Sequence, residues 1–591
     1  MDFLGLRNLT VINKTIKMIN QNHSILINIE NIDLCDLDVY KLFASGNTIG
    51  IFQFESRGMR DYLKKLNPNC IEDLIAMTSL YRPGPMANIP EFLARKNNNK
   101  TIKYLHPDLE PILKETYGII VYQEQVMQIG SIIGGFTLAQ SDAMRKAMGK
   151  KKKDLMATFK IDFIKGAKDK KLSEELAIEI FDLLAKFAEY GFNKSHAAAY
   201  SVISYQTAWL KTHYSSEFMA SNLSSDLLNT DSIIKLLRNT KLLKLNILAP
   251  NVNTSTTEFI AIDDINISYG LAGIKNVGYK SIEQLVKYRS KNDPFKTIFD
   301  LCKMGSQAMN KKVLESLIKA GACDELEGNR AQQHKLINDA LKFGQKYNED
   351  INSVQSSLFS SEVQNNTYTK TPLPQLDDWS KTEKLNYEKE VLGFYLSGNP
   401  LDKHIDDLTI FTNFGVQNLK TFNQSYYKIG GRIFDTKVLY DKKNNPWCIS
   451  RLECYNGTIV ELFTFSDVYI KYKDFFINDN IIYIEGEPSK KDNDDSFKVI
   501  TKKVYNISEI RSKFSNKLNI KIDFEINNKD IINDLYEIAT QFPGKCNLIL
   551  HLVNNKGLVQ KIQSDNILIS NESACVKILE DKMGSKNVWI L

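Results

Sequence analysis

The 591-residue chain is too long for one hydrophobic core, and roughly four domains of about 150 residues each are expected. Its 43% of hydrophobic and 25% of charged residues are typical of a soluble globular protein, and no apolar run approaches the ~18 residues of a membrane-spanning helix. The net charge of +6 permits a nucleic acid as partner but does not by itself indicate one.

The eight cysteines predict neither a disulfide framework nor a zinc site. No two of them have the C-x-x-C spacing, and the chain has only seven histidines. The first residues, MDFLGLRNLT, also lack the charged-then-apolar layout of a signal peptide. We therefore expect a cytoplasmic protein in a reducing environment.

Residues 1–225 are predicted to be mainly helical. Ser173 is a suitable N-cap, and two glutamates follow it in the first turn, where the helix dipole favours negative charge. Apolar residues then keep helical spacing from Leu176 to Phe187, and Gly191 is expected to end the helix. Such a stripe indicates packing against a core.

Positive charge is concentrated in one segment of this helical part. Residues 141–171 contain eleven Lys and Arg against four Asp, a local balance of +7, whereas the whole chain carries +6. Arg145 and Lys146 lie beside the small Ala147, which leaves room for a phosphate chain, and an Arg can bind phosphate oxygens bidentately. The lysine run that follows, GKKKK, is typical of a solvated helix end.

Two more places combine cations with small or rigid residues. In GFNKSHAAAY, Lys194 and His196 could both reach one anion, and the alternative is a histidine at the surface or satisfied in the core. Tyr200 and Tyr205 could stack on bases or pack in the core, and their spacing does not decide between the two. Arg82 in Arg-Pro-Gly-Pro is a cation on a rigid turn, where a structural corner explains the motif as well as a phosphate contact does.

The segment from 268 to 327 contains short helical patterns on either side of the sequence GIKNVG. Gly273 and Gly278 would allow backbone N–H groups to approach a phosphate at the start of a helix, and Lys275 and Lys280 accompany them. Such a hairpin binds a nucleic-acid backbone without reading its sequence.

Residues 345–390 have a different composition. Asn, Gln, Ser, Thr and Pro dominate there and apolar periodicity is lost, so a mobile linker is expected. Within it, Gln355, Leu358 and Phe359 belong to the sequence QSSLF, which has the form of a docking motif whose apolar pair would fill a pocket. A chance match is the alternative for so short a string.

Beyond this segment the pattern is typical of strands. Five runs of alternating residues lie between 425 and 506, and the pair Asn456 and Gly457 predicts a hairpin between the second run and the third. Five short strands predict a small barrel or sandwich. The tail, 515–591, mixes strand-like and helical runs and is expected to be a small α+β domain.

Several long motifs resemble, in order, those of the bacterial DNA polymerase III alpha subunits, the C-family replicative polymerases. They are FQFESRGMRDYLKKL, LYRPGP, YGIIVYQEQVMQI, MRKAMGKKK and YGFNKSHAAAYSVISYQTAWLK, followed by GLAGIKNVG, VLESLIKAGACDEL and QSSLF. The resemblance covers essentially the whole chain and corresponds to the C-terminal half of the family's sequence.

The resemblance implies a multidomain protein with a mainly helical fingers region, a helix-hairpin-helix segment, an OB-type β-barrel and a small α+β C-terminal domain. The first boundaries expected from it are 1–30 for a remnant of the palm, 31–230 for the fingers and 231–344 for the helix-hairpin-helix DNA-binding region. The remaining ones are 345–390 for a linker with a clamp-binding motif, 391–510 for the OB domain and 511–591 for a domain that binds the clamp loader.

The implied activity is template-directed DNA synthesis by nucleotidyl transfer, with two Mg²⁺ ions in the complete active site. Asp2 matches the third of three catalytic, metal-binding palm aspartates, and the other two are expected to lie outside this chain. The implied nucleotide-binding residues are Arg82, Arg145, Lys146, Lys194 and His196. The implied DNA-binding residues are Gly273, Lys275, Gly278 and Lys280, and the clamp-binding ones are Gln355, Leu358 and Phe359.

The implied partners are primer–template DNA, deoxynucleoside triphosphates, the sliding clamp and a clamp-loader subunit. A proofreading exonuclease subunit is not expected to bind, because the family's N-terminal PHP region is absent from this sequence. The alternative function is a non-catalytic fragment that binds DNA, clamp and clamp loader.

Overall fold

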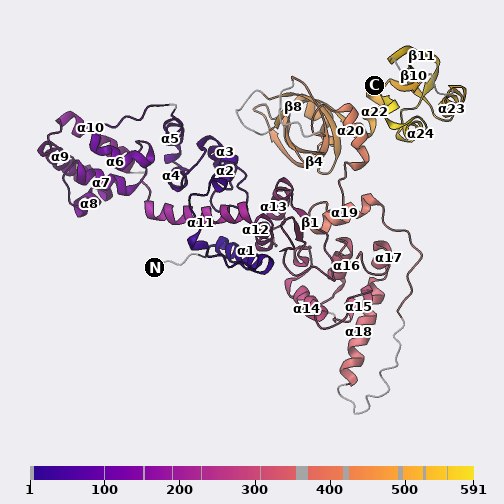
Figure 1. Cartoon of the computed structure of the whole chain (residues 1–591), viewed down its shortest axis with the longest axis horizontal. Coiled ribbons are helices and arrows are strands. Elements are labelled where there is room, and N and C mark those ends of the chain that lie inside the picture. Colours follow the sequence, from indigo (N-terminus) through magenta and orange to yellow (C-terminus); the bar gives the residue numbers. More distant parts are fainter. Residues whose placement is uncertain are drawn as a thin grey trace. The chain divides into compact units, whose positions relative to one another are not determined.

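The computed structural model describes residues 5–590 apart from 99, 151–152, 189–190, 228, 306–307, 355–369, 417–424, 490–496, 524–527 and 555–556. The chain forms two compact units, Met1–Leu396 and Ser397–Leu591, which are taken in turn (Figure 1). In the described residues no helix is both long and apolar enough to cross a lipid bilayer.

The N-terminal part of the first unit is helical, as the sequence predicts. The Leu176 N–H donates to Ser173 Oγ at 3.2 Å, which confirms the predicted N-cap. The helices are α1 (Arg7–His23), α2 (Leu37–Ser45), α3 (Arg57–Leu66), α4 (Ile71–Leu80), α5 (Ile89–Lys96), α6 (Glu110–Leu113), α7 (Gln123–Ile132), α8 (Leu138–Gly149), α9 (Lys153–Asp169), α10 (Glu174–Ala188), α11 (Lys194–His213), α12 (Ser215–Ser225) and α13 (Thr230–Leu242).

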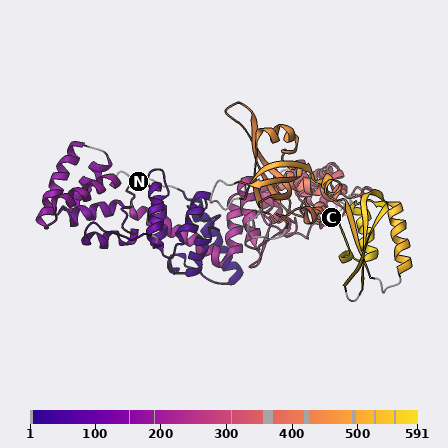
Figure 2. The same cartoon turned by 90° about the horizontal axis from the view of Figure 1, so that it is seen from above.

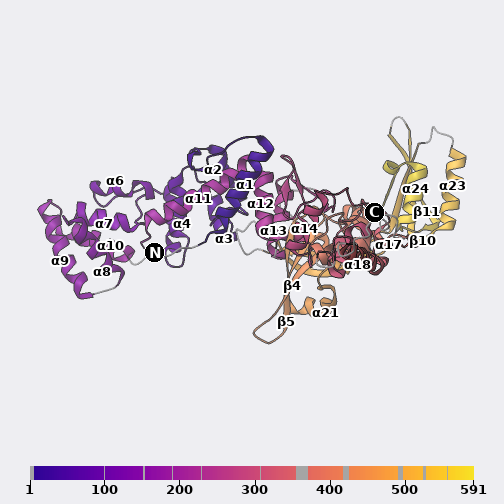
Figure 3. The ribbon, with the colours of Figure 1, turned by 90° about the horizontal axis from the view of Figure 1, so that it is seen from below.

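These helices enclose separate hydrophobic cores. Helices α6 to α10 form one group, and α2 to α5 form another beside it (Figures 1 and 3). Helix α11 has 20 residues and is therefore about 30 Å long. Its Tyr205 is buried in the core of α2 to α5, whereas its Leu210 is buried in the next core along the chain. One continuous helix thus ties two cores together.

The rest of the first unit combines a small sheet with further helices. The sheet has the order β1-β3-β2, with β1 parallel and β2 antiparallel to β3. Its strands are β1 (Asn246–Leu248), β2 (Ile260–Ala261) and β3 (Asn266–Ser268). The helices are α14 (Tyr279–Arg289), α15 (Ile298–Cys302), α16 (Lys311–Lys319), α17 (Arg330–Lys335), α18 (Ile337–Val354) and α19 (Lys381–Leu392).

The prediction of a mobile linker over 345–390 is wrong at both ends. Helix α18 continues to Val354, and α19 begins after Ser380, whose side chain and that of Glu383 exchange hydrogen bonds with the backbone. Glu388 of α19 is buried and accepts a hydrogen bond from Arg330 of α17 at 3.1 Å. The composition favoured a linker because the parts of both helices that lie in this segment are mainly polar.

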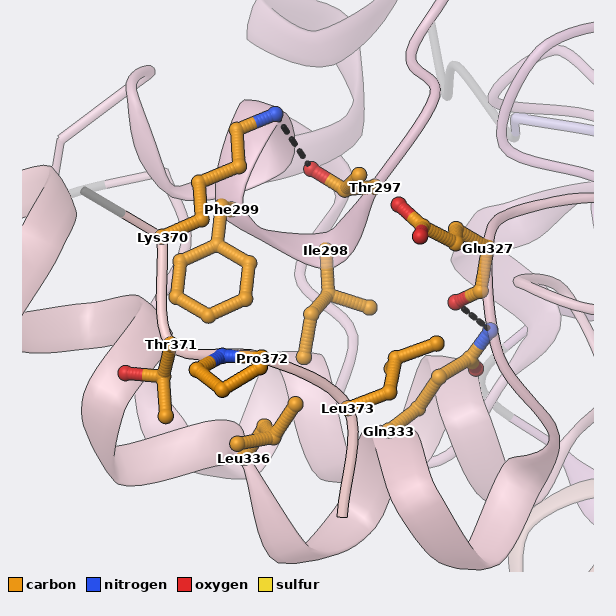
Figure 4. A pocket seen from close by; sticks show the side chains of 10 residues that line it. All are labelled: Thr297, Ile298, Phe299, Glu327, Gln333, Leu336, Lys370, Thr371, Pro372 and Leu373. Carbon is orange, nitrogen blue, oxygen red and sulfur yellow. Dashed lines mark hydrogen bonds between the residues drawn. The ribbon is translucent and has the colours of Figure 1, made fainter. Parts of the chain in front are cut away.

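Residues 370–373, also inside the predicted linker, close a cavity of about 230 Å³ (Figure 4). Lys370 Nζ donates to Thr297 Oγ1 at 3.1 Å on one side of it, while Leu373 lies near Gln333 and Leu336 on the other. None of the residues predicted to bind a ligand lines this cavity. The contacts of Lys370 and Leu373 therefore anchor residues 370–373 to the neighbouring helices. The cavity itself offers no support for the predicted site.

The second unit begins with a closed five-stranded barrel of order β4-β5-β6-β8-β7. All neighbouring pairs are antiparallel except β6 and β8. Asn456 and Gly457 lie in the hairpin between β5 and β6, as predicted, and the β4–β5 hairpin extends beyond the barrel (Figures 2 and 3). The strands are β4 (Tyr427–Tyr440), β5 (Pro446–Cys454), β6 (Ile459–Thr464), β7 (Ile481–Pro488) and β8 (Phe497–Asn506), with helices α20 (Ile405–Phe411), α21 (Ser466–Tyr472) and α22 (Ile510–Phe514).

The C-terminal part of the second unit is a four-stranded sheet of order β11-β10-β9-β12 with two helices. Its elements are β9 (Lys517–Asp523), α23 (Asn528–Gln541), β10 (Pro543–Asn554), β11 (Gly557–Ile569), α24 (Ser573–Met583) and β12 (Val588–Ile590). The expected multidomain α and β fold class is therefore confirmed, and the barrel decides between the two β architectures left open by the sequence.

A buried lysine fixes the position of α11. Lys211 is 1% exposed, and its Nζ donates to the carbonyls of Asn47 and Ile49 at 2.7 and 2.8 Å and to Asn239 Oδ1 at 2.8 Å. Burial disfavours the charged form of Lys211 and lowers its pKa. The three oxygen acceptors act in the opposite direction, because they match the three N–H donors of a charged ammonium group. The side chain joins α11 to the α2–α3 connection and to α13.

We expect Lys211→Met to destabilise the packing of α11 by ~3 kcal/mol, because three buried oxygens would lose their hydrogen-bond donor. Hydrogen exchange followed by mass spectrometry on peptides of α11 and α13 measures this as faster amide exchange. Lys235→Met is the matched control, since the Lys235 side chain is 45% exposed and its ion pair with Glu55 lies at the surface. Equal exchange in the two variants would contradict the role given to Lys211.

Candidate functional site

A short bridge between two distant segments forms the base of the candidate site. Tyr122 and Phe192 pair as in a parallel ladder: the Gln123 N–H donates to the Phe192 carbonyl at 2.9 Å, and the Phe192 N–H donates to the Val121 carbonyl at 3.0 Å. The buried Gln125 side chain accepts from the N–H groups of Val121 and Tyr122. These bonds place the start of α7 beside the start of α11.

Arg145 reaches this bridge from α8. Its Nη1 donates to Gln123 Oε1 at 3.0 Å, while its Nε and Nη2 donate to Asp142 Oδ1 at 3.1 and 2.7 Å. Lys146 Nζ contacts Asp142 Oδ2 at 2.6 Å, and its side chain is 60% exposed. Hydrogen bonds from Lys146 and Arg145 hold the pKa of Asp142 below its usual range. The two cations therefore share one ionised carboxylate.

Lys194 is the first residue of α11 and lies between two glutamates. Its N–H donates to both oxygens of Glu124, at 3.1 and 3.0 Å, where the helix dipole favours a carboxylate. Its Nζ donates to both oxygens of Glu115, at 2.8 and 2.7 Å, and lies 5.4 Å from the centre of the Tyr122 ring. The ammonium group is thus held beside the bridge by a partly exposed ion pair.

A series of stacked groups continues from the bridge along α11. The Arg82 guanidinium lies 4.5 Å from the centre of the Phe192 ring, and the Phe192 and His196 rings meet edge to face at 5.5 Å. His196 stacks on Tyr200 at 4.4 Å, and Tyr200 lies 5.4 Å from Phe52. His196 is exposed and the other four are half-buried. This row presents cationic and aromatic groups along one side of α11.

The structure brings four of the five predicted nucleotide-binding residues to the bridge: Arg82, Arg145, Lys194 and His196. Lys146 joins them through the carboxylate of Asp142. Of the two tyrosines left open by the sequence, Tyr205 is buried in the core and Tyr200 belongs to the stacked row.

Sequence reasoning missed the groups that hold these cations. Asp142 precedes Arg145 and Lys146 by three and four residues, a spacing that places all three on one helix face and could have identified it. Glu115 and Phe52 carry no such local signal, because they lie 79 and 148 residues from their partners Lys194 and Tyr200.

The four predicted DNA-binding residues lie around the start of α14: Gly273, Lys275 and Gly278 precede the helix, and Lys280 is its second residue. The last three are exposed, and a Cβ added to Gly278 would have only Ser281 Oγ, at 3.6 Å, within 4 Å. A Cβ added to Gly273 would instead lie 3.3 Å from the Phe259 ring, so this glycine permits close packing. Close approach of a phosphate therefore fits Gly278 and not Gly273.

Asp2 and the three predicted clamp-binding residues, Gln355, Leu358 and Phe359, lie outside the described residues. Within the described part of the chain, a group of possible metal ligands is formed by His23, Glu217 and Asp264. The Glu217 oxygens already accept hydrogen bonds from Asn22, His23 and Ser216. A histidine also suits Mg²⁺ poorly, since this ion prefers oxygen ligands. This group therefore does not fit the two Mg²⁺ ions that the sequence implies.

Comparisons with known proteins match most of the chain. The family model of the bacterial DNA polymerase III alpha subunit finger domain matches residues 8–171, and that of a helix-hairpin-helix motif matches residues 244–333. The DNA polymerase III subunit alpha of Borreliella burgdorferi is 37% identical over 602 residues, and that of Pseudomonas aeruginosa is 35% identical over 621 residues.

Each of these two alignments covers 100% of the chain and 52% of the relative. The subunit alpha of Xylella fastidiosa strain 9a5c is 38% identical over 575 residues, which cover 94% of the chain and 48% of that protein. The chain thus spans about half the length of the curated relatives that it matches.

Proposed function

Because the chain belongs to the family of bacterial DNA polymerase III alpha subunits, we propose that it forms part of the catalytic subunit of a replicative DNA polymerase. Its reaction would be attack of a primer 3′-hydroxyl on the α-phosphorus of a deoxynucleoside triphosphate, with release of pyrophosphate. The observation that carries this proposal is the convergence of Arg82, Arg145, Lys194 and His196 on the bridge between residues 121–124 and 191–193.

The cations at the bridge suit a triphosphate. Arg145 and Lys146 on α8 and Lys194 on α11 would contact its oxygens, with Arg82 as a further cation beside Phe192. Arg can bind two phosphate oxygens at once, and Lys acts as a point charge.

The row formed by His196, Tyr200 and Phe52 would offer ring faces to a base. Stacking of a base on an aromatic side chain contributes about 1–3 kcal/mol and is tolerant of sequence. Such contacts suit an enzyme that must accept any of four bases. His196 is the exposed member of the row and is therefore the proposed contact.

Existing ion pairs do not prevent this use of the lysines. The pairs of Lys194 with Glu115 and of Lys146 with Asp142 are partly exposed, and such pairs contribute only ~0.2–1 kcal/mol. A triphosphate carries more negative charge than one carboxylate, and its oxygens form hydrogen bonds of the same charge-assisted kind. It can therefore replace Glu115 as the partner of Lys194.

The exposed turn before α14, together with the first turn of that helix, is the proposed contact with the DNA backbone. Lys275 and Lys280 would neutralise phosphates, and the open side of Gly278 would let the first N–H groups of α14 approach one. The Lys275 N–H is not available for this purpose, because it donates to the Val391 carbonyl at 2.8 Å.

The roles of Mg²⁺ and of Asp2 remain predictions from the resemblance, and the same holds for the clamp and the clamp loader as partners. Two Mg²⁺ ions, when bound, would stabilise the charge on the attacking and leaving oxygens. The alternative function, a module that binds DNA without catalysis, predicts DNA binding in the absence of synthesis.

Primer extension by a chimaera distinguishes the two functions. The chimaera would join residues 1–591 to the N-terminal half of the Borreliella burgdorferi relative, whose intact protein is the positive control. We expect Mg²⁺-dependent extension of a primed template, because the proposed nucleotide contacts all lie in the described chain. A chimaera that binds the template with the affinity of the control but extends no primer would support the binding module.

Arg145→Ala in this chimaera is expected to raise the KM for the deoxynucleoside triphosphate at least about tenfold, which corresponds to about 1.4 kcal/mol. Affinity for primer–template, measured by fluorescence anisotropy, should change less than about twofold. The control is Lys168→Ala, which removes an exposed cation paired with Glu174 on a neighbouring helix. Equal losses in nucleotide use and DNA affinity would remove Arg145 from the nucleotide site.

Replacement of Leu358 and Phe359 by Ala is expected to weaken binding of the sliding clamp at least about tenfold, because an apolar anchor pair accounts for much of such a short motif's affinity. Surface plasmon resonance against immobilised clamp measures this loss. Affinity for primer–template should be unchanged. Full clamp affinity in the double variant would exclude QSSLF as the docking motif.

A further inference from the structure

Asp142 is held in one arrangement by two neighbours on α8. Its Oδ1 accepts from Arg145 Nε and Nη2 at 3.1 and 2.7 Å, and its Oδ2 contacts Lys146 Nζ at 2.6 Å. The three residues occupy positions i, i+3 and i+4, so they share one helix face. Both oxygens of one carboxylate therefore act on the two cations proposed to bind the triphosphate.

Arg145 is also held from the opposite side. Its Nη1 donates to Gln123 Oε1 at 3.0 Å, and the Gln123 side chain in turn donates through Nε2 to the Gly191 carbonyl at 3.1 Å. The Gln123 N–H is fixed by its bond to Phe192. The guanidinium is thus restrained by α8 and by the bridge together, and its side chain is only 21% exposed.

A guanidinium has five N–H donors, and the contacts with Asp142 and Gln123 engage one on each of its three nitrogens. The second N–H of each terminal nitrogen is not part of these contacts with described residues. The edge between the two terminal nitrogens is one that can bind two oxygens of one phosphate.

We propose that Asp142 is the positioning residue for Arg145: it fixes the guanidinium so that this edge faces the triphosphate before the nucleotide arrives. The proposal rests on the proposed nucleotide site. An Arg side chain loses much rotamer freedom when it is ordered, and ordering it beforehand removes that cost from nucleotide binding. Ion pairs of this spacing add little to stability, so orientation is the effect that the contact can supply.

The opposite effect is a carboxylate that competes with phosphate for Arg145. Competition predicts tighter nucleotide binding when Asp142 is removed, whereas positioning predicts weaker binding. The geometry favours positioning, because Asp142 engages the side of the guanidinium that includes Nε, and Asp142 and Gln123 together leave one N–H on each terminal nitrogen.

The test is a double-mutant cycle in the active chimaera with Asp142→Ala, Arg145→Ala and the double variant. We expect Asp142→Ala to raise the KM for nucleotide about threefold to tenfold with kcat and primer–template affinity nearly unchanged. In the Arg145→Ala background the same change should have less than a twofold effect. Asp142→Asn should be intermediate, since its amide oxygen can still accept from Arg145 but its nitrogen cannot accept from Lys146.

Isothermal titration with a non-hydrolysable deoxynucleoside triphosphate gives a second readout that needs no turnover. Asp182→Asn is the matched control, because Asp182 forms a comparable exposed ion pair with Lys160 at 2.6 Å. A lower KM in Asp142→Ala would overturn the proposal in favour of competition. An equal rise in KM with and without Arg145 would overturn it in favour of a merely structural role.

The cycle also separates the failure of this inference from that of the proposed function. A normal KM in Arg145→Ala would overturn both, because the guanidinium would then not contact nucleotide. A raised KM in Arg145→Ala with a normal KM in Asp142→Ala would overturn the positioning role alone.

Discussion

The backbone bridge between Tyr122 and Phe192 is the constraint on which the candidate site depends. Two hydrogen bonds join segments about 70 residues apart and bring the starts of α7 and α11 together. The Gln123 side chain accepts a hydrogen bond from Arg145, and the Phe192 ring contacts the Arg82 guanidinium and begins the stacked row. Without the bridge, Arg145 would belong to one packed group of helices, and Arg82, Lys194 and His196 would belong to another.

Helix α11 connects the bridge to the rest of the first unit. The helix begins at the bridge with Lys194, whose N–H is bound by Glu124, and it ends in a second core. Lys211 pins its far half through three oxygen acceptors. Because α11 is one continuous helix of 20 residues that is held near both ends, its exposed face keeps a fixed position relative to the two cores.

The sequence predicted those parts of the fold whose signals are local. Strand alternation and the pair Asn456 and Gly457 identified all five barrel strands and a hairpin, because period-two patterns and turn residues act over short distances. Composition failed for residues 345–390, where α18 and α19 are polar helices held by tertiary contacts. The buried pair of Arg330 and Glu388 is one such contact, and its partners are 58 residues apart.

The same distinction decides what could be known of the candidate site. The small residues beside Arg145 and Lys194 identified these two cations as candidates. The anions that pair with them, Asp142 and Glu115, differ in whether the sequence reveals them. Asp142 follows from helical spacing, since i+3 and i+4 neighbours must meet on the surface of α8. Glu115 depends on how distant helices pack, which periodicity does not determine. Asp142 can therefore orient Arg145 through the geometry of α8 alone, whereas Glu115 meets Lys194 only because the tertiary fold brings the two segments together.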